Sequence, residues 1–553
     1  FLLVNGIGKT YARQALDELI EQELPPYYQL AYDELELNLF DRELTITNLI
    51  FTPDSSIQRT GADRSYRVHI PHFNVRLKSL EAILYRKELI VEGITVVDPQ
   101  FAVMDFSKDR TLTATTESFS LFELVRQYLS VFRVKSFEVK NAGLQYQRDN
   151  EQRSGDFLLK AFDFRVNEFA LDSNLTRQNF LNAESVELII NKQQFYLSDN
   201  IHRFSFDQFR MSTRDSVLNF SNVLLEPRDT HTAAAWSPAS GPALYRIAIP
   251  EVNLNGIDYY ESYLNKDLRI DQVVFQSPQI DIAGGQRRLR EARGPGESAV
   301  LAGLAQISTS LGVGHFQLNQ ANVNLDFQEV RDRDFHFLVD YINLYQCVID
   351  PTNITYSRAN PPFQDFSFQL SEFRERLPDG LHVLQVGQVL IPSMNEGIAL
   401  KDFSIVPYRE VPHPHKTKVV QHFPFLSVDG IDYLGFLQQE PLRLGHVFIK
   451  EPVTRIITPL ESQQDSSRKE LKIAGIRSSI TGSFLQEISA ERLNVEAGRW
   501  QLDDWMQVGT YDFDARGFLL NEQTQDWKSL ADTFSLNIAD LDMQRDSMTV
   551  HLE

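Results

Sequence analysis

The stretch YRVHIPHFNVRLKSLEAILYRKELIVEGITVVDPQFAV, residues 66–103, decides the fold because it recurs twice more along the chain. The second copy, residues 245–282, reads YRIAIPEVNLNGIDYYESYLNKDLRIDQVVFQSPQIDI, and the third, residues 419–457, reads VVQHFPFLSVDGIDYLGFLQQEPLRLGHVFIKEPVTRII. Such self-similarity indicates a repeat architecture. Each copy carries two prolines at the same spacing: Pro71 and Pro99, Pro250 and Pro278, Pro424 and Pro452.

Apolar residues also recur at matching positions of the three copies. They alternate with polar residues, as expected for strands with one buried face. The alternation changes parity between Val91 and Ile94, which predicts a bulge or bend near Gly93. These matching positions are the candidate binding residues: Leu89, Val91, Ile94 and Val96; Leu268, Ile270, Val273 and Phe275; Leu442, Leu444, Val447 and Ile449.

Two further blocks follow in the same order and extend the repeat to about 175–180 residues. One block reads FEVKNAGLQY, FQLNQANVNLDF and RLNVEAGRWQL, in which we align Ala142, Ala321 and Ala497. The other ends in ELTITNLIFTP, SVLNFSNVLLEP and GIALKDFSIVP. Prolines cannot donate to a central ladder, so we expect the repeated prolines at strand ends or edges.

The fold class that follows is mainly β. We expect an elongated, twisted antiparallel sheet array curled into an open groove, with short helices between units. The segment KTYARQALDELIEQE, residues 9–23, has helical periodicity and predicts an N-terminal helix. Shorter helices are expected at 79–87, 117–131 and 298–311. An ordinary packed β core is the alternative, because alternating strands usually pair face to face.

The repeat gives five segments. Residues 1–26 form the N-terminal helix after a trimmed membrane anchor, for which Phe1–Val4 is the expected remnant. Residues 27–227, 228–407 and 408–530 form three β-groove repeats, and residues 531–553 begin a further one.

Composition excludes several classes of protein. The 553 residues carry 54 Lys+Arg and 75 Asp+Glu, a net charge of −21, which disfavours nucleic-acid binding. One cysteine, Cys347, excludes a disulfide framework, and its apolar neighbours indicate a small buried side chain. No apolar run reaches the 18 residues of a membrane span.

The sequence offers little catalytic or metal-binding chemistry. Gly6–Thr10 ends like a phosphate-binding loop but lacks its first glycine. The histidines His413, His415 and His422 lie too sparsely for a convincing metal site. His202 and His382 recur at equivalent positions, which favours a structural role. We therefore expect no enzyme activity, no cofactor and no metal; the arginine-rich segment 284–298 is expected to be a loop.

The segments GIDYYESYLNKDLRIDQVVFQSPQIDI and GIDYLGFLQQEPLRLGHVFIKEPVTRII resemble the recurring unit of AsmA-like proteins, a superfamily that includes TamB-like members. This resemblance implies a periplasmic protein of a Gram-negative bacterium, anchored in the inner membrane by one N-terminal helix. It also implies an apolar β-groove that moves phospholipid acyl chains toward the outer membrane without catalysis, with outer-membrane or envelope proteins as partners. The alternative is a structural scaffold in an envelope assembly complex that carries no lipid.

Overall fold

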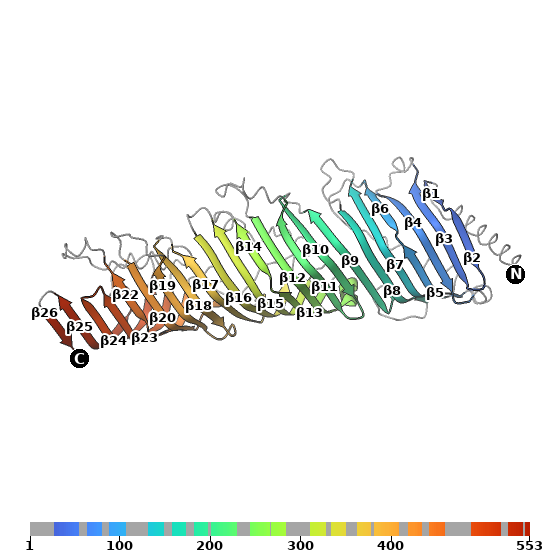
Figure 1. Ribbon diagram of the computed structural model, residues 1–553. Helices are drawn as coiled ribbons and strands as arrows, with labels where there is room; N and C mark the ends of the chain where they lie inside the picture. Colours follow the sequence, from blue (N-terminus) through green and yellow to red (C-terminus); the bar gives the residue numbers. More distant parts are fainter. Residues whose placement is uncertain are drawn as a thin grey trace. The chain divides into compact units, whose positions relative to one another are not determined.

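The structure is a computed structural model in which 26 strands join one mixed sheet, accompanied by one short helix in the described part of the chain (Figure 1). The mainly β expectation is therefore confirmed, but the expected antiparallel sheet is a mixed one, because each round contains parallel pairs such as β5 with β7. The described residues are 27–54, 64–79, 88–106, 131–148, 157–172, 182–196, 201–228, 244–265, 267–283, 310–327, 333–349, 362–377, 381–408, 418–433, 442–458, 488–520, 529–545 and 548–552. The helix expected at 9–23 and nearly all of those expected at 79–87, 117–131 and 298–311 lie outside these ranges. The described ends at 131 and 310–311 are strand residues of β7 and β15.

The chain divides into two compact units, Phe1–Arg228 with Glu251–Asp271, and Asp229–Pro250 with Gln272–Glu553. The first unit holds α5 (Tyr259–Asn265) and β1 (Tyr28–Ala31), β2 (Glu34–Asn38), β3 (Glu43–Pro53), β4 (Arg64–Leu77), β5 (Glu88–Val97), β6 (Gln100–Asp105), β7 (Val131–Arg148), β8 (Phe157–Asp172), β9 (Ser185–Tyr196), β10 (His202–Ser212) and β11 (Val217–Pro227). Both units share β12 (Leu244–Ile257) and β13 (Asp267–Gln276).

The second unit holds the remaining strands: β14 (Gln279–Ala283), β15 (Ser310–Phe327), β16 (Arg333–Ile349), β17 (Asp365–Arg376), β18 (His382–Ile391), β19 (Ile398–Pro407), β20 (Lys418–Asp429), β21 (Leu442–Lys450), β22 (Val453–Ile457), β23 (Ile488–Leu502), β24 (Met506–Leu520), β25 (Thr533–Arg545) and β26 (Met548–Leu552). We call β4–β11 the first round of the repeat, β12–β19 the second and β20–β26 the third.

Strand pairing repeats from round to round. In the first round β4 pairs antiparallel with both β5 and β6, and β7 runs parallel to both, so β5 and β6 lie end to end. In the third round β20 pairs antiparallel with β21 and β22, and β23 runs parallel to both. The one parallel step explains the long chain segment before β7 and β23, because parallel neighbours need a crossover connection.

The second proline of each copy marks the junction between the end-to-end strands. The residue before it takes a left-handed conformation, with φ of 54° at Asp98, 48° at Ser277 and 50° at Glu451. The proline carbonyl of each junction then accepts the N–H of the parallel neighbour, as Pro99 does from Gly143 at 2.8 Å. Proline is tolerated there because the strand has already broken.

A further repeated proline ends the strand before each round: Pro53 before β4, Pro227 before β12 and Pro407 before β20. At two of them a side chain replaces a missing backbone hydrogen bond. Pro53 and Pro407 are paired with Tyr28 and His382 at the ends of their ladders. The Tyr66 N–H donates to Tyr28 Oη at 3.1 Å, and the Val419 N–H donates to His382 Nε2 at 3.0 Å. His202 is equally paired with Pro227 and is buried, so these recurring histidines occupy a structural position.

The end of the third round and one sequence alignment need revision. β25 pairs with β24 as β9 pairs with β8, so residues from 533 onward extend the third round rather than begin a further repeat. The left-handed residue is Asn141 in β7, Gln320 in β15 and Ala497 in β23. Ala142 and Ala321 therefore correspond to Gly498, one residue beyond the alanine that we aligned.

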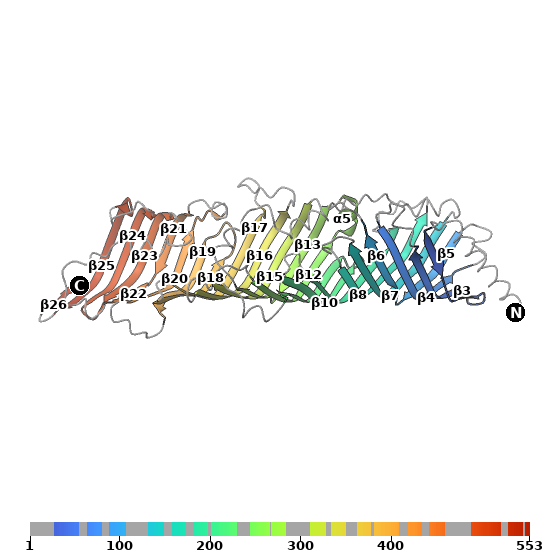
Figure 2. The same ribbon diagram turned by 90° about the horizontal axis from the view of Figure 1, so that it is seen from above.

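Left-handed residues recur inside the long strands, which bend along their length within each unit (Figure 2). At two equivalent positions an aspartate of the neighbouring strand accepts a hydrogen bond from the left-handed residue of the bulge. Asp163 Oδ1 accepts the Asn141 N–H at 2.7 Å, and Asp512 Oδ1 accepts the Ala497 N–H at 2.9 Å. An extra residue in this conformation sharpens the local twist and turns the strand.

Ala497 offers a direct test of the bulge because its side chain is a single methyl. At φ 55° the variant Ala497→Gly should match or exceed the wild-type stability, whereas Ala497→Val should lose about 1–2 kcal/mol because the left-handed region crowds Cβ. Denaturant unfolding followed by hydrogen exchange of β23 and β24 would measure this. Equal stability of the two variants would contradict the assigned backbone.

Candidate functional site

Two chemically different faces follow from the alternation in β7 and β8. Phe137 and Val139 lie in an apolar cluster, while Glu138 between them forms an ion pair with Arg165 at 3.1 Å. In β8, Phe164 belongs to the same cluster, and the adjacent Arg165 does not. Because neighbouring side chains of a strand point to opposite faces, one face is apolar and the other polar.

The apolar face of the first unit is defined by this cluster. Val96, Val139 and Ala142 are buried at its centre, and Ala142 is fully inaccessible. The cluster spans β4 to β8. The side chains packed against its centre are Ile70, Phe73, Ile94, Phe101, Phe137, Phe162 and Phe164.

The second unit carries the same face at equivalent positions. Ala321, Val323 and Val339 form its buried centre, and Ala321 is again fully inaccessible. The surrounding side chains come from β14 to β17. They are Ile280, Leu318, Leu325, Phe337, Ile342 and Phe368.

Large side chains on this face remain partly open. Among the described phenylalanines only Phe206 is buried, at 6% exposure, and the largest fully buried side chains are Val383, Asp105 and Pro99. A second layer packed on the face would bury phenylalanine and leucine first. Among the described residues, most phenylalanines of the apolar face therefore stay partly exposed, while valines and alanines make up most of its buried centre.

The predicted residues of the first copy share the apolar face. Phe73 is paired with Val96, Val75 with Ile94 and Leu77 with Val91, and the register shifts between the last two pairs, so that Glu92 is the extra residue. The bulge that we predicted near Gly93 is therefore confirmed.

The other two copies give the same placement. Ile270 and Val273 are buried, and the ring of Phe275 meets that of Phe316 edge-on, with centroids 5.4 Å apart. In β21, Val447 and Ile449 pair with Val428 and Leu426 of β20. The remaining predicted positions are part of the same strands: Leu89, Leu268, Leu442, whose side chain lies outside the described set, and Leu444.

Sequence reasoning missed a large aromatic part of this face in the first unit. Phe206 of β10 lies within 6.4 Å, ring centroid to centroid, of four other phenylalanine rings. They belong to β9, β10 and β11, which lie outside the repeat block that supplied the candidates. The alternation in HRFSFDQFRMS, residues 202–212, was the available signal. The four rings are those of Phe195, Phe204, Phe209 and Phe220.

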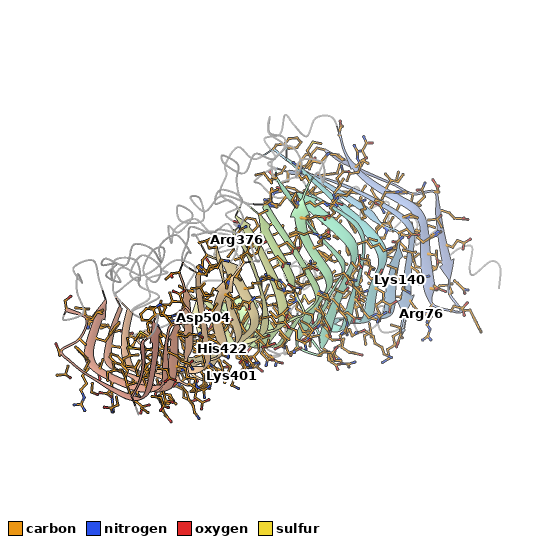
Figure 3. The ribbon with its side chains drawn as sticks, turned by 60° about the vertical axis from the view of Figure 1, so that its left-hand side comes forward. Arg76, Lys140, Arg376, Lys401, His422 and Asp504 are labelled. Carbon is orange, nitrogen blue, oxygen red and sulfur yellow. The ribbon has the colours of Figure 1, made fainter. Side chains whose placement is uncertain are left out.

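On the polar face of every round, side chains of neighbouring strands form a row of ion pairs or hydrogen bonds, which we call the side-chain ladder. In the first unit an ion-pair chain joins Glu138, Arg165, Glu187 and Arg210, with steps of 3.1, 3.6 and 3.1 Å. Labelled side chains of this face, including Lys140, project from the outer side of the curved strands (Figure 3).

The other rounds replace these charges. In the second round, Gln317 accepts from Gln272 at 2.8 Å, and Asn343 donates to Ser367 at 3.0 Å. In the third, Asp514 accepts from Arg492 at 2.9 Å. The ladder position therefore tolerates charged and neutral pairs alike.

The repeated Gly-Ile-Asp-Tyr motif ends the first strand of the second and third rounds. Gly256 and Gly430 both have a φ of 68°, and Asp258 caps α5 by accepting the Glu261 N–H at 3.0 Å. Tyr259 Oη donates to the Val217 carbonyl at 2.6 Å, and Tyr433 Oη donates to the Glu396 carbonyl at 3.2 Å. Burial raises the pKa of Tyr433 to about 12. The motif is structural.

The remaining chemistry is sparse in the described residues. Cys347 is buried, as we predicted, and desolvation raises the pKa of its thiol. His422 lies on β20 with its neighbour Phe423 on the apolar face, while His413 and His415 fall outside the described residues. No cluster of three metal-binding side chains occurs among the residues that the structure describes, and none of its described helices is long and apolar enough to cross a membrane.

Comparison with known proteins adds little. No family model and no curated protein matches the chain. One solved structure, that of the sex pheromone staph-cAM373 precursor, aligns with 60% of this chain and 88% of its own at 9% identity. Its TM-score of 0.13 carries no argument about fold or function.

The ion pairs of the polar face predict how the stability of the protein depends on pH. Hydrogen bonding by Lys140, followed by the charge of Lys140 and Arg165, lowers the pKa of Glu138 below 4.5. Its stabilising effect is therefore complete above pH 4.5 and is lost as the pH falls through the lower folded-state pKa. Converting the pair to the second-round type, Glu138→Gln with Arg165→Asn, should cost less than about 1 kcal/mol at neutral pH because the pair is partly exposed.

Thermal unfolding of wild type and this double variant between pH 3 and pH 7 would measure the effect. The difference between them should shrink as the solution becomes more acidic and as salt is added. A difference that grows toward low pH would contradict the assigned ion pair.

Proposed function

We propose that the protein binds lipids by their acyl chains along the apolar face and passes them along the sheet without chemical change. The observation that supports this is the recurrence of one apolar face, with partly open phenylalanines, in both units. Acyl chains would cover those side chains, at about 0.8 kcal/mol for each methylene removed from water.

The repetition of similar apolar positions favours movement of a bound lipid along the sheet over tight binding at one position. The same level of the sheet holds Val96 in the first round, Phe275 in the second and Ile449 in the third. Neighbouring binding positions of similar chemistry give a chain similar free energies at each step. A lipid would then move without a deep minimum, while the polar face stays in water. The proposal includes a curled, open groove in which the apolar face would line the inner side of the bent strands of each unit.

The cellular setting of the proposal rests on the resemblance to AsmA-like proteins. It comprises a periplasmic location, an inner-membrane anchor and lipid movement between the inner and outer membranes, with envelope proteins as partners. A scaffold role is the contrasting outcome, in which a partner protein covers the apolar face. Native mass spectrometry with lipid extraction distinguishes the two: near-stoichiometric phospholipid supports binding, and a lipid-free protein with its apolar face covered by a partner opposes it.

Carboxylates introduced on the apolar face and on the polar face provide a matched test of lipid binding. Val273→Asp and Ile449→Asp place a carboxylate on the apolar face, whereas Val274→Asp and Phe448→Asp place it one residue away on the polar face. We expect the first pair to lower bound phospholipid at least tenfold, because a carboxylate beside an acyl chain is desolvated. The second pair should retain it. Circular dichroism and hydrogen exchange would verify the fold of all four, and equal lipid content in both pairs would overturn the proposal.

A further inference from the structure

One row of the third round breaks the apolar pattern. Gln421 of β20 is paired with Thr454 of β22, and Thr454 is paired with Trp500 of β23. The three side chains therefore lie next to one another across three neighbouring strands. We call Gln421, Thr454 and Trp500 the polar row.

The polar row lies on the apolar face. Gln421 is two residues from Phe423, whose ring stacks on that of Phe403 at 5.2 Å, and no register shift separates them. The equivalent of Thr454 in the first round is Phe101, which belongs to the apolar cluster. The corresponding residues of the other rounds are all apolar: Val68, Phe101 and Leu144 in the first, and Ile247, Ile280 and Val323 in the second.

The polar groups of this row are open for a ligand. All three side chains are partly exposed, and their amide, hydroxyl and indole groups have no hydrogen-bond partner among the described residues. Asn343 on the polar face, by contrast, donates to Ser367 at 3.0 Å. The row thus presents three donors within an apolar surface.

The position of the polar row along the strands indicates how a bound lipid is oriented. Gln421 lies near the start of β20, which begins at Lys418. At the next level toward that strand end the third round has Val419, Ile456 and Leu502, and the earlier rounds include the tyrosines Tyr66, Tyr146 and Tyr245. Tyrosine and tryptophan favour places where an apolar medium meets a polar one. Farther along the strands, Leu426 and Val428 continue the apolar face.

We propose that the polar row binds the ester carbonyls of an acyl lipid. The tails then extend from the row along Phe423, Leu426 and Val428, and the headgroup points toward the start of β20. A carbonyl oxygen only accepts hydrogen bonds, and Thr454, Trp500 and the Gln421 amide all donate. This inference rests on the proposed function, since it assigns the orientation of a lipid on the same face.

Tryptophan quenching tests that orientation. The first probe protein keeps Trp500 and replaces Trp236, Trp505 and Trp527 by phenylalanine. It is loaded with phosphatidylcholine brominated either near the ester or near the terminal methyl. We expect the ester-proximal bromine to quench Trp500 at least twofold more strongly.

A matched probe reports a deeper level. Leu493→Trp, with all four native tryptophans replaced by phenylalanine, puts the reporter on the same strand β23, seven residues before position 500 and beside Val447. Here the methyl-proximal bromine should quench more strongly. Quenching at both positions without depth preference, or with the reverse order, overturns the orientation and leaves lipid binding intact. No quenching of either probe overturns both proposals.

A double variant tests the hydrogen bonds themselves. Gln421→Ile with Thr454→Ile restores the two residues of the second round, Ile247 and Ile280, so the fold should accept it. Affinity for a palmitoyl ester should fall about 5- to 30-fold, as expected for one or two lost hydrogen bonds. Affinity for an alkane of equal length should stay the same or rise. Equal changes for ester and alkane would refute a carbonyl site.

Discussion

The structure depends on keeping one face apolar through strands that contain bulges. Side chains alternate, so an extra residue in one strand would move every later apolar side chain to the other face. The first round shows the solution. Val91 and Ile94 have opposite parity and pair with Val134 and Phe137, which differ in the same way. Because adjacent strands shift at the same level, the bulge bends the sheet without exchanging its faces.

The need to keep one face apolar explains which features the three rounds share and which differ among them. The polar face accepts an ion-pair chain in the first round and amides in the second, because water satisfies either one. On the apolar face a small side chain is required where neighbours approach closely. Ala142 and Ala321 are fully inaccessible, and a Cβ added to Gly498 would meet the Tyr511 ring at 2.4 Å.

Much of the fold was predictable because its signals are periodic. Alternation predicts the strands, repeated prolines predict their ends and breaks, and the parity change at Val91 and Ile94 predicts a bulge that the register confirms. The third-round alignment failed by one residue because alanine identity favoured Ala497 over Gly498. Only the backbone shows that Ala497 takes the left-handed position of Asn141.

Apart from the bulge near Gly93, the bends were not predicted from the sequence, because glycine does not mark them. Most left-handed residues inside strands are polar, such as Lys192, Gln320 and Glu372. Each lies in a strand that pairs on both sides with neighbouring strands. The polar row was missed for a related reason. Gln421, Thr454 and Trp500 come from separate strands, and only their register shows that they form one feature. The backbone hydrogen bonds of the sheet do not require polar side chains at these three positions. Since the other two rounds fold with apolar residues at this level, the row is better explained by what it binds than by what it stabilises.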